Sequence, residues 1–179
     1  MYAQLLAPVF AELSDGPLVL VGHSFGGTIA TVIAAERPQL VRALVLVGSP
    51  VLRGTSGATP ARRFRVIRWL HRKGLVGDQA MESARQRFGS ADYRNANGRL
   101  REILVASVQE SLEDELRRVQ APVVMVWGAR DLEVPLDVAR RAATLLTTPS
   151  TLHVLDDVGH LVPTSDPNAI VSAVREALA

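Results

Sequence analysis

With 179 residues, of which 47% are hydrophobic and 21% charged, the chain is long enough for one globular domain and too apolar to be intrinsically disordered. It contains no cysteine, which excludes disulfide bonds and thiolate metal sites. The formal net charge is only +2, and the sequence has no recognisable nucleic-acid-binding motif, so we expect no nucleic-acid partner.

The N-terminal segment Met1–Leu13 has a helix-like pattern and lacks the basic start of a signal peptide, so we expect no signal peptide. The longest apolar stretches, such as Leu18–Val21 and Ala43–Val47, are far too short to span a bilayer. Together with the lack of cysteine, these features favour a cytoplasmic protein.

Four short apolar segments predict β-strands: Leu18–Val21, Ala43–Gly48, Val123–Gly128 and Thr151–Leu155. The first three are nearly continuous runs of valine, leucine and methionine, typical of strands buried on both faces of a parallel sheet. Helical patterns lie between and after the strands, at Gly27–Glu36, Leu136–Leu146 and Ala169–Leu178. Strands that alternate with helices predict an α/β fold.

A long segment, residues 51–121, separates the second predicted strand from the third, and most of it has helical patterns such as the spacing of Phe64, Ile67 and Leu70. We interpret it as a helical cap inserted between two parts of one core, residues 1–50 and 122–179. Its basic part, residues 51–101, holds 12 of the 20 lysines and arginines and only three acidic residues. We expect a solvated helical face there, although such a charge could also attract anionic substrates or a membrane surface.

The strongest motif is Gly-His-Ser-Phe-Gly-Gly at residues 22–27, which comes directly after a predicted strand and directly before a predicted helix. That setting is the one a nucleophile elbow requires, with Ser24 on a sharp, strained turn. We expect side chains at Gly22 or Gly26 to collide with neighbouring backbone. The start of the following helix would supply the Phe25 N–H as a donor to an oxyanion. The alternative is a glycine turn with an incidental serine.

A nucleophilic serine needs a general base, and the base needs an acid that orients it. Asp131 follows the third predicted strand, where the ligand-facing loops of open sheets lie, and His160 follows the last. The alternatives are a turn or helix-capping aspartate and a surface-loop histidine. The competing side chains are Glu133, Asp156, Asp157, His23, His71 and His153. We expect His23 to point away from the site, His71 to lie in the cap and His153 to have a structural role in a strand.

These residues resemble motifs of the α/β-hydrolase superfamily: Gly22–Gly27 its nucleophile elbow, Trp127–Pro135 its acid loop and Asp157–Pro163 its histidine loop. The order serine, aspartate, histidine is also that of the family. The resemblance implies a truncated α/β-hydrolase fold, made of the last four parallel strands with flanking helices and an inserted helical cap. It also implies a catalytic triad of Ser24, Asp131 and His160.

The family's sheet has eight strands, and the sequence supplies only four of them, without the upstream loop that usually gives a second oxyanion donor. The strand Leu18–Val21 would then be an exposed apolar edge, which invites pairing with another chain. Three explanations are open. The chain is a piece of a longer enzyme, it pairs with a partner or a copy of itself that covers the edge, or it is a minimal hydrolase.

We expect a serine hydrolase that cleaves carboxylic esters, lactones or thioesters through an acyl-enzyme, without a metal or an organic cofactor. The alternatives are a C–C bond hydrolase of the same superfamily and a non-catalytic or partner-dependent binding module. The cap should select the substrate. Phe64, Trp69 and Phe88 could line an acyl pocket or belong to the core, and an arginine among residues 62–72 could hold a substrate carboxylate.

Overall fold

The computed structural model describes residues 2–53, 62–88 and 111–179. Its centre is a four-stranded sheet in which all neighbouring strands are parallel. The strands are β1 (Leu18–His23), β2 (Val41–Val47), β3 (Val123–Gly128) and β4 (Ser150–Leu155), and they lie side by side in the order β1-β2-β3-β4. The four predicted strands are therefore confirmed, with bounds that differ by two residues at most.

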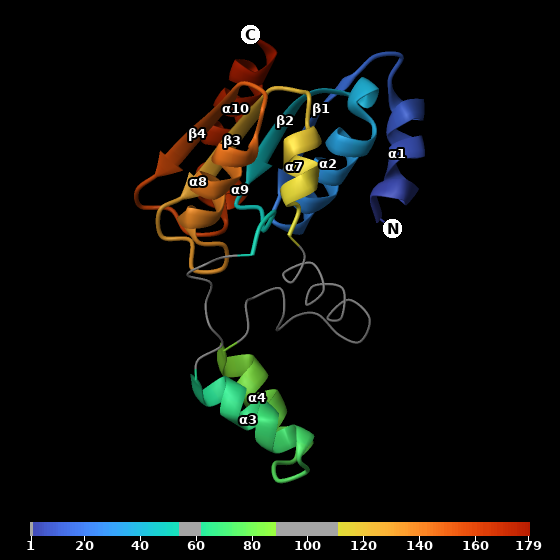
Figure 1. Cartoon of the computed structure of the whole chain (residues 1–179). Coiled ribbons are helices and arrows are strands. Elements are labelled where there is room, and N and C mark those ends of the chain that lie inside the picture. The colour runs from blue at the N-terminus through green and yellow to red at the C-terminus, as the bar shows by residue number, and fades with distance from the viewer. Residues whose placement is uncertain (1, 54–61, 89–110) are drawn as a thin grey trace.

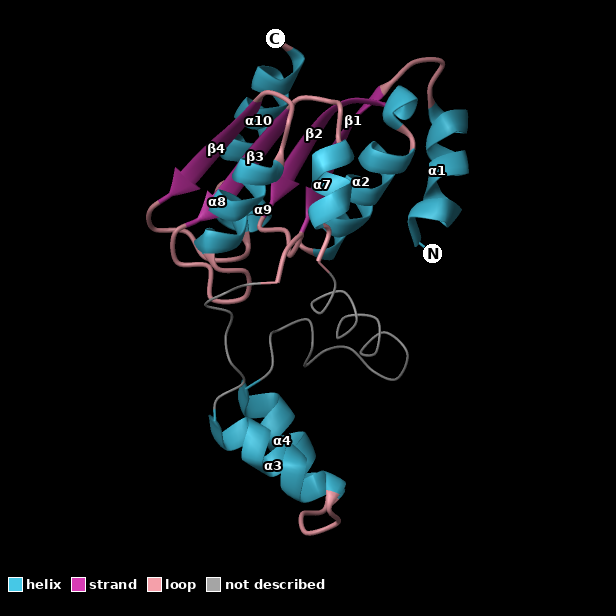
Figure 2. Ribbon diagram, viewed as in Figure 1, coloured by secondary structure: helices cyan, strands magenta, loops and turns pink. Residues whose placement is uncertain are grey.

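Helices cover both faces of the sheet (Figure 2). One face carries α2 (Phe25–Glu36), α7 (Glu113–Arg118) and α8 (Leu136–Leu145), and α1 (Tyr2–Leu13) packs against α2 (Figure 1). The other face carries α10 (Pro167–Leu178), which follows the short α9 (Val162–Ser165). A single 3₁₀ turn, Pro38–Leu40, joins α2 to β2. None of the described helices combines the length and the apolar character needed to cross a membrane.

The alternation of side chains along β2 explains why its sequence is continuously apolar. Leu44 and Leu46 pack among the side chains of the α2, α7 and α8 face, whereas Val45 and Val47 pack against α9 and α10. All four side chains are fully buried. Because each fully buried side chain of this size contributes about 1.5–3 kcal/mol, the two-sided core holds β2 firmly at the centre of the domain.

The two edge strands of the described sheet differ in character. On β1, the side chain of Val21 is 48% exposed. On β4, Ser150, Thr151 and His153 interrupt the apolar pattern. His153 hydrogen-bonds to Glu176 of α10, as expected of a structural role in the strand. A hydrogen bond from Thr151, followed in importance by that from His153, lowers the pKa of the Glu176 carboxyl below its usual value.

The predicted insertion contains α3 (Arg62–Arg72), α4 (Asp78–Phe88) and α7. The helices α3 and α4 pack against each other and project beyond the carboxyl ends of the strands (Figure 1). In contrast, α7 packs against α2 and α8, with Leu116 fully buried in the core. By its packing α7 therefore belongs to the helical layer of the sheet and not to the α3–α4 hairpin.

Candidate active site

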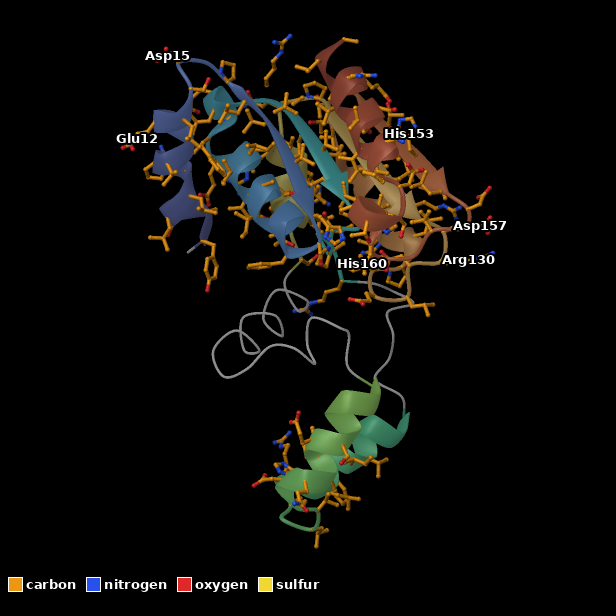
Figure 3. All side chains as sticks on the ribbon, turned by 180° about the vertical axis from the view of Figure 1, so that it is seen from behind. Glu12, Asp15, Arg130, His153, Asp157 and His160 are labelled. Carbon is orange, nitrogen blue, oxygen red and sulfur yellow. The ribbon has the colours of Figure 1, made fainter. Side chains whose placement is uncertain are left out.

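Three polar side chains singled out in the sequence meet at one end of the sheet. Ser24 follows β1, Asp131 follows β3 and His160 follows β4. Because the strands are parallel, the loops after their carboxyl ends gather at the same edge. Figure 3 shows His160 at this end of the sheet, on the side from which the α3–α4 hairpin projects.

The three side chains form a continuous hydrogen-bonded chain. The Oγ atom of Ser24 lies 3.1 Å from Nε2 of His160, and Nδ1 of His160 lies 2.8 Å from Oδ2 of Asp131. The side chains of His160 and Asp131 are 6% and 0% exposed. In this arrangement His160 donates through Nδ1–H to the carboxylate, which leaves Nε2 able to accept the serine proton.

Ser24 sits on the strained turn that the motif predicted. Its φ of 50° is the only positive value of a non-glycine residue among the described residues. The turn is tight because β1 runs directly into α2: a Cβ atom on Gly22 would lie 2.4 Å from the Cα atom of Gly27. The expected collision was wrong for Gly26, where a Cβ atom would meet nothing within 4 Å. The second close approach is at Gly27, where a Cβ atom would lie 1.9 Å from Oγ of Ser49.

The start of α2 lies directly behind Ser24. Phe25 is the first residue of this helix, so its backbone N–H belongs to the helix end that lacks intrahelical acceptors and carries a partial positive charge. Its ring packs edge-on against Tyr2 of α1, with the ring centroids 5.7 Å apart. The oxyanion role predicted for the Phe25 N–H is compatible with this position.

The acid loop is folded around Asp131 itself. Oδ1 of Asp131 accepts hydrogen bonds from the backbone N–H groups of Glu133 (2.9 Å) and Val134 (2.8 Å). The buried indole of Trp127 donates to the carbonyl of Val134 at 2.9 Å. Asp131 thus closes a turn with one oxygen and binds His160 with the other, so its turn-forming contacts are compatible with the orienting role predicted for it.

Of the competing acids, Asp157 forms an ion pair with Arg130, and both side chains are largely exposed (Figure 3). Asp156 is exposed on the same loop. Glu133 lies closer to the three side chains: its Oε2 atom is 3.8 Å from Nε2 of His160.

Two contacts of the site were not predicted from the sequence. Gly48, directly after β2, has a φ of +50°, and a Cβ atom there would lie 3.2 Å from Oδ2 of Asp131 and 3.3 Å from Nδ1 of His160. His23 was expected to point away, but its Nε2 atom lies 2.9 Å from the backbone carbonyl of His160. The sequence signal for the close packing at Gly48 was its position, a glycine at the end of a central predicted strand. No sequence signal distinguishes His23, because its contact joins the end of β1 to a loop 137 positions further along the chain.

Of the three residues proposed for an acyl pocket, only Trp69 has a side chain that the structure describes. Trp69 lies on α3 and is 56% exposed. Phe64 and Phe88 lie on α3 and α4, but their side chains are outside the described residues. His71, also on α3, hydrogen-bonds to Asp78 of α4. Within the described part of the chain, no group of three or more histidine, aspartate and glutamate side chains is arranged to hold a metal ion.

Comparison with known proteins gives one family. Residues 2–174 match the profile of the alpha/beta hydrolase family. Relatives include the uncharacterized hydrolase YugF of Bacillus subtilis, at 28% identity over 97% of this chain and 70% of the relative. Lipase LipV of Mycobacterium tuberculosis is 27% identical over 97% of this chain and 73% of the relative. The 2-hydroxy-6-oxo-2,4-heptadienoate hydrolase of Pseudomonas putida is 25% identical over 97% of this chain and 68% of the relative.

A solved structure supports the fold independently. A hydrolase from Pseudomonas aeruginosa PA01 matches 99% of this chain and 70% of its own length, with a TM-score of 0.68 and 19% identity. At this level of sequence identity, the similarity shows the fold alone.

Proposed function

The chain belongs to the alpha/beta hydrolase family, with the fold that its motifs predicted, and on that basis we propose that it is a serine hydrolase acting on carboxylic esters, lactones or thioesters. The observation that carries the proposal is the hydrogen-bonded chain Ser24–His160–Asp131. A serine held on a strained turn and hydrogen-bonded to a carboxylate-oriented imidazole is the arrangement that activates a hydroxyl for nucleophilic attack.

The proposed mechanism has two halves. Ser24 Oγ attacks the carbonyl carbon while His160 Nε2 takes its proton, and the Phe25 N–H donates to the carbonyl oxygen as it becomes negative. His160 then returns the proton to the leaving alcohol or thiol, which departs and leaves an acyl group on Ser24. Water then attacks the acyl carbon while His160 Nε2 takes its proton, and His160 returns that proton to Oγ of Ser24 as the acid is released. Asp131 stabilises the imidazolium in both halves.

The names of two relatives point to cleavage of different kinds of bond. The name of the lipase points to ester cleavage, whereas that of the heptadienoate hydrolase points to cleavage of a C–C bond next to a ketone. Both reactions need a carbonyl carbon held beside a nucleophile or an activated water. We place ester-type cleavage first, because the 3.1 Å contact between Ser24 Oγ and His160 Nε2 suits direct attack by the serine. C–C bond hydrolysis is the second candidate.

Steady-state hydrolysis tests the proposal, with p-nitrophenyl butyrate as the ester and a 2-hydroxy-6-oxo-2,4-dienoate as the C–C substrate. The wild-type chain should cleave the ester, and Ser24→Ala should lower kcat/KM by about 10³-fold or more. Ser24-dependent consumption of the dienoate without ester cleavage would favour the second candidate. Cleavage of neither substrate by folded protein would favour a non-catalytic module.

A further inference from the structure

A second carboxylate lies beside the proposed triad, on the side of His160 that faces the nucleophile. Oε2 of Glu133 is 3.8 Å from Nε2 of His160, the same nitrogen that lies 3.1 Å from Oγ of Ser24. The carboxylate oxygen is therefore within about 7 Å of the nucleophilic oxygen, a range over which two charges interact appreciably. The side chain is 31% exposed, so it lies at the surface of the site.

The position of Glu133 is fixed by the turn that holds Asp131. Its backbone N–H donates to Oδ1 of Asp131 at 2.9 Å, and that of the next residue, Val134, donates to the same oxygen. Its carboxylate cannot share the orienting role, because Nδ1 of His160 is already bound to Asp131 and Glu133 faces the other ring nitrogen. The residue therefore contributes a charge to the side of the imidazole where a substrate must bind.

Within the described residues, the carboxylate of Glu133 lies beside Nε2 of His160, and the two form an ion pair only when that ring is protonated. Arg130, the arginine on the same loop, pairs with Asp157. A negative charge thus faces the reaction centre without an arginine or lysine partner in the described part of the chain. An acyl group bound at Ser24 must extend from a carbon close to Oγ, which places its first few atoms within the range of this charge.

We propose that Glu133 is a specificity-determining residue that disfavours substrates carrying a free carboxylate on the acyl part and so directs the site toward neutral or cationic acyl groups. This inference rests on the proposed function. Its direction is opposite to that of the substrate-binding arginine considered among residues 62–72, because the charge described beside Nε2 of His160 is negative.

The size of the effect follows from Coulomb's law. A substrate carboxylate held about 7 Å from Glu133 in a partly hydrated site would be repelled enough to change a rate by roughly 3- to 10-fold. Glu133 also favours the imidazolium that forms on His160, and that effect is common to every substrate. A ratio of kcat/KM values for two substrates cancels the common effect and isolates the charge preference.

The test compares p-nitrophenyl hexanoate with the mono-p-nitrophenyl ester of adipate, which has the same chain length and a terminal carboxylate. The measured quantity is kcat/KM for the adipate ester divided by that for the hexanoate ester. Glu133→Gln should raise this ratio by roughly 3- to 10-fold, and Glu133→Lys should raise it further. The control is Asp156→Asn, which removes one negative charge from an exposed position on the histidine loop and should leave the ratio within about twofold.

An unchanged ratio in Glu133→Gln and Glu133→Lys, with hexanoate still cleaved, would overturn the inference and leave the proposed function intact. An equal rise in Asp156→Asn would also overturn it, because the effect would then come from net charge. Absence of hexanoate cleavage together with absence of Ser24 labelling by a fluorophosphonate would instead contradict the proposed function itself, and the inference with it.

Discussion

The imidazole of His23 holds the loop that carries His160 by its backbone. Nε2 of His23 lies 2.9 Å from the carbonyl oxygen of His160, and the two rings are 4.9 Å apart. Because a carbonyl only accepts, Nε2 of His23 must carry the proton that is donated. The contact joins the end of β1 to the loop after β4, which are the two edge strands of the described sheet.

Replacement of His23 should therefore misplace the base without removing it. We expect His23→Leu to lower kcat by about tenfold and stability by about 1 kcal/mol, since one part-buried hydrogen bond is lost. His23→Gln keeps an N–H donor and should lose less activity. His71→Leu on α3 is the control and should keep the wild-type kcat. Equal kcat values for His23→Leu and wild type would show that His23 does not position His160.

A side chain at Gly48 should disturb the Asp131–His160 pair directly. Its Cβ atom would lie 3.2 and 3.3 Å from the two hydrogen-bonded atoms, and its positive φ disfavours any other residue. We expect Gly48→Ala to cost about 1–2 kcal/mol of stability and at least about tenfold in kcat. Gly16→Ala is the matched control, because a Cβ atom there meets nothing within 4 Å. Thermal unfolding and ester hydrolysis measure both effects, and wild-type behaviour of Gly48→Ala would contradict the packing.

The backbone strain at Ser24 predicts an unusual order of stabilities. Glycine tolerates a positive φ and alanine does not, so Ser24→Gly should be more stable than Ser24→Ala by about 1 kcal/mol. At Ser172, exposed on α10, the order should reverse, because glycine in a helix is about 1 kcal/mol less favourable than alanine. Denaturant unfolding of the four variants tests this. The same order at both positions would show that Ser24 is unstrained.

Asp131→Asn should separate the two roles of this side chain. The asparagine Oδ1 can still accept from the N–H groups of Glu133 and Val134, so the loop should keep its fold. Its amide N–H would then face Nδ1 of His160 and force the ring proton onto Nε2, which can no longer accept from Ser24. We expect kcat to fall on the order of 10³–10⁴-fold with KM little changed. A loss below about tenfold would mean that Asp131 does not set the tautomer.

Local sequence patterns were sufficient to predict most of the fold. The valine- and leucine-rich runs predicted the strands, because a strand buried on both faces cannot alternate polar and apolar residues. The elbow could be placed because the strand, the glycines and the helix follow one another directly along the chain. Because Ser24, Asp131 and His160 follow the carboxyl ends of β1, β3 and β4, they meet at one edge of a parallel sheet.

What the sequence did not predict depends on contacts between distant segments. The backbone contact of His23 and the close packing of Gly48 exist only once β1, β2 and the last loop are assembled. Gly26 was assigned a steric role by its place in the motif, but Gly27 is the residue that lies against Ser49. Likewise, α7 lies within the segment predicted as a cap, but it packs in the core. Its contacts with α2 show this, and its helical pattern does not.

The central claim is that Ser24 is an activated nucleophile, and intact-mass labelling with a fluorophosphonate probe tests it most directly. Such probes phosphonylate a serine only where a base activates it, so no knowledge of the substrate is needed. The account predicts one adduct on the wild-type chain and none on Ser24→Ala. The absence of an adduct on folded wild-type protein, or an equal adduct on Ser24→Ala, would contradict it.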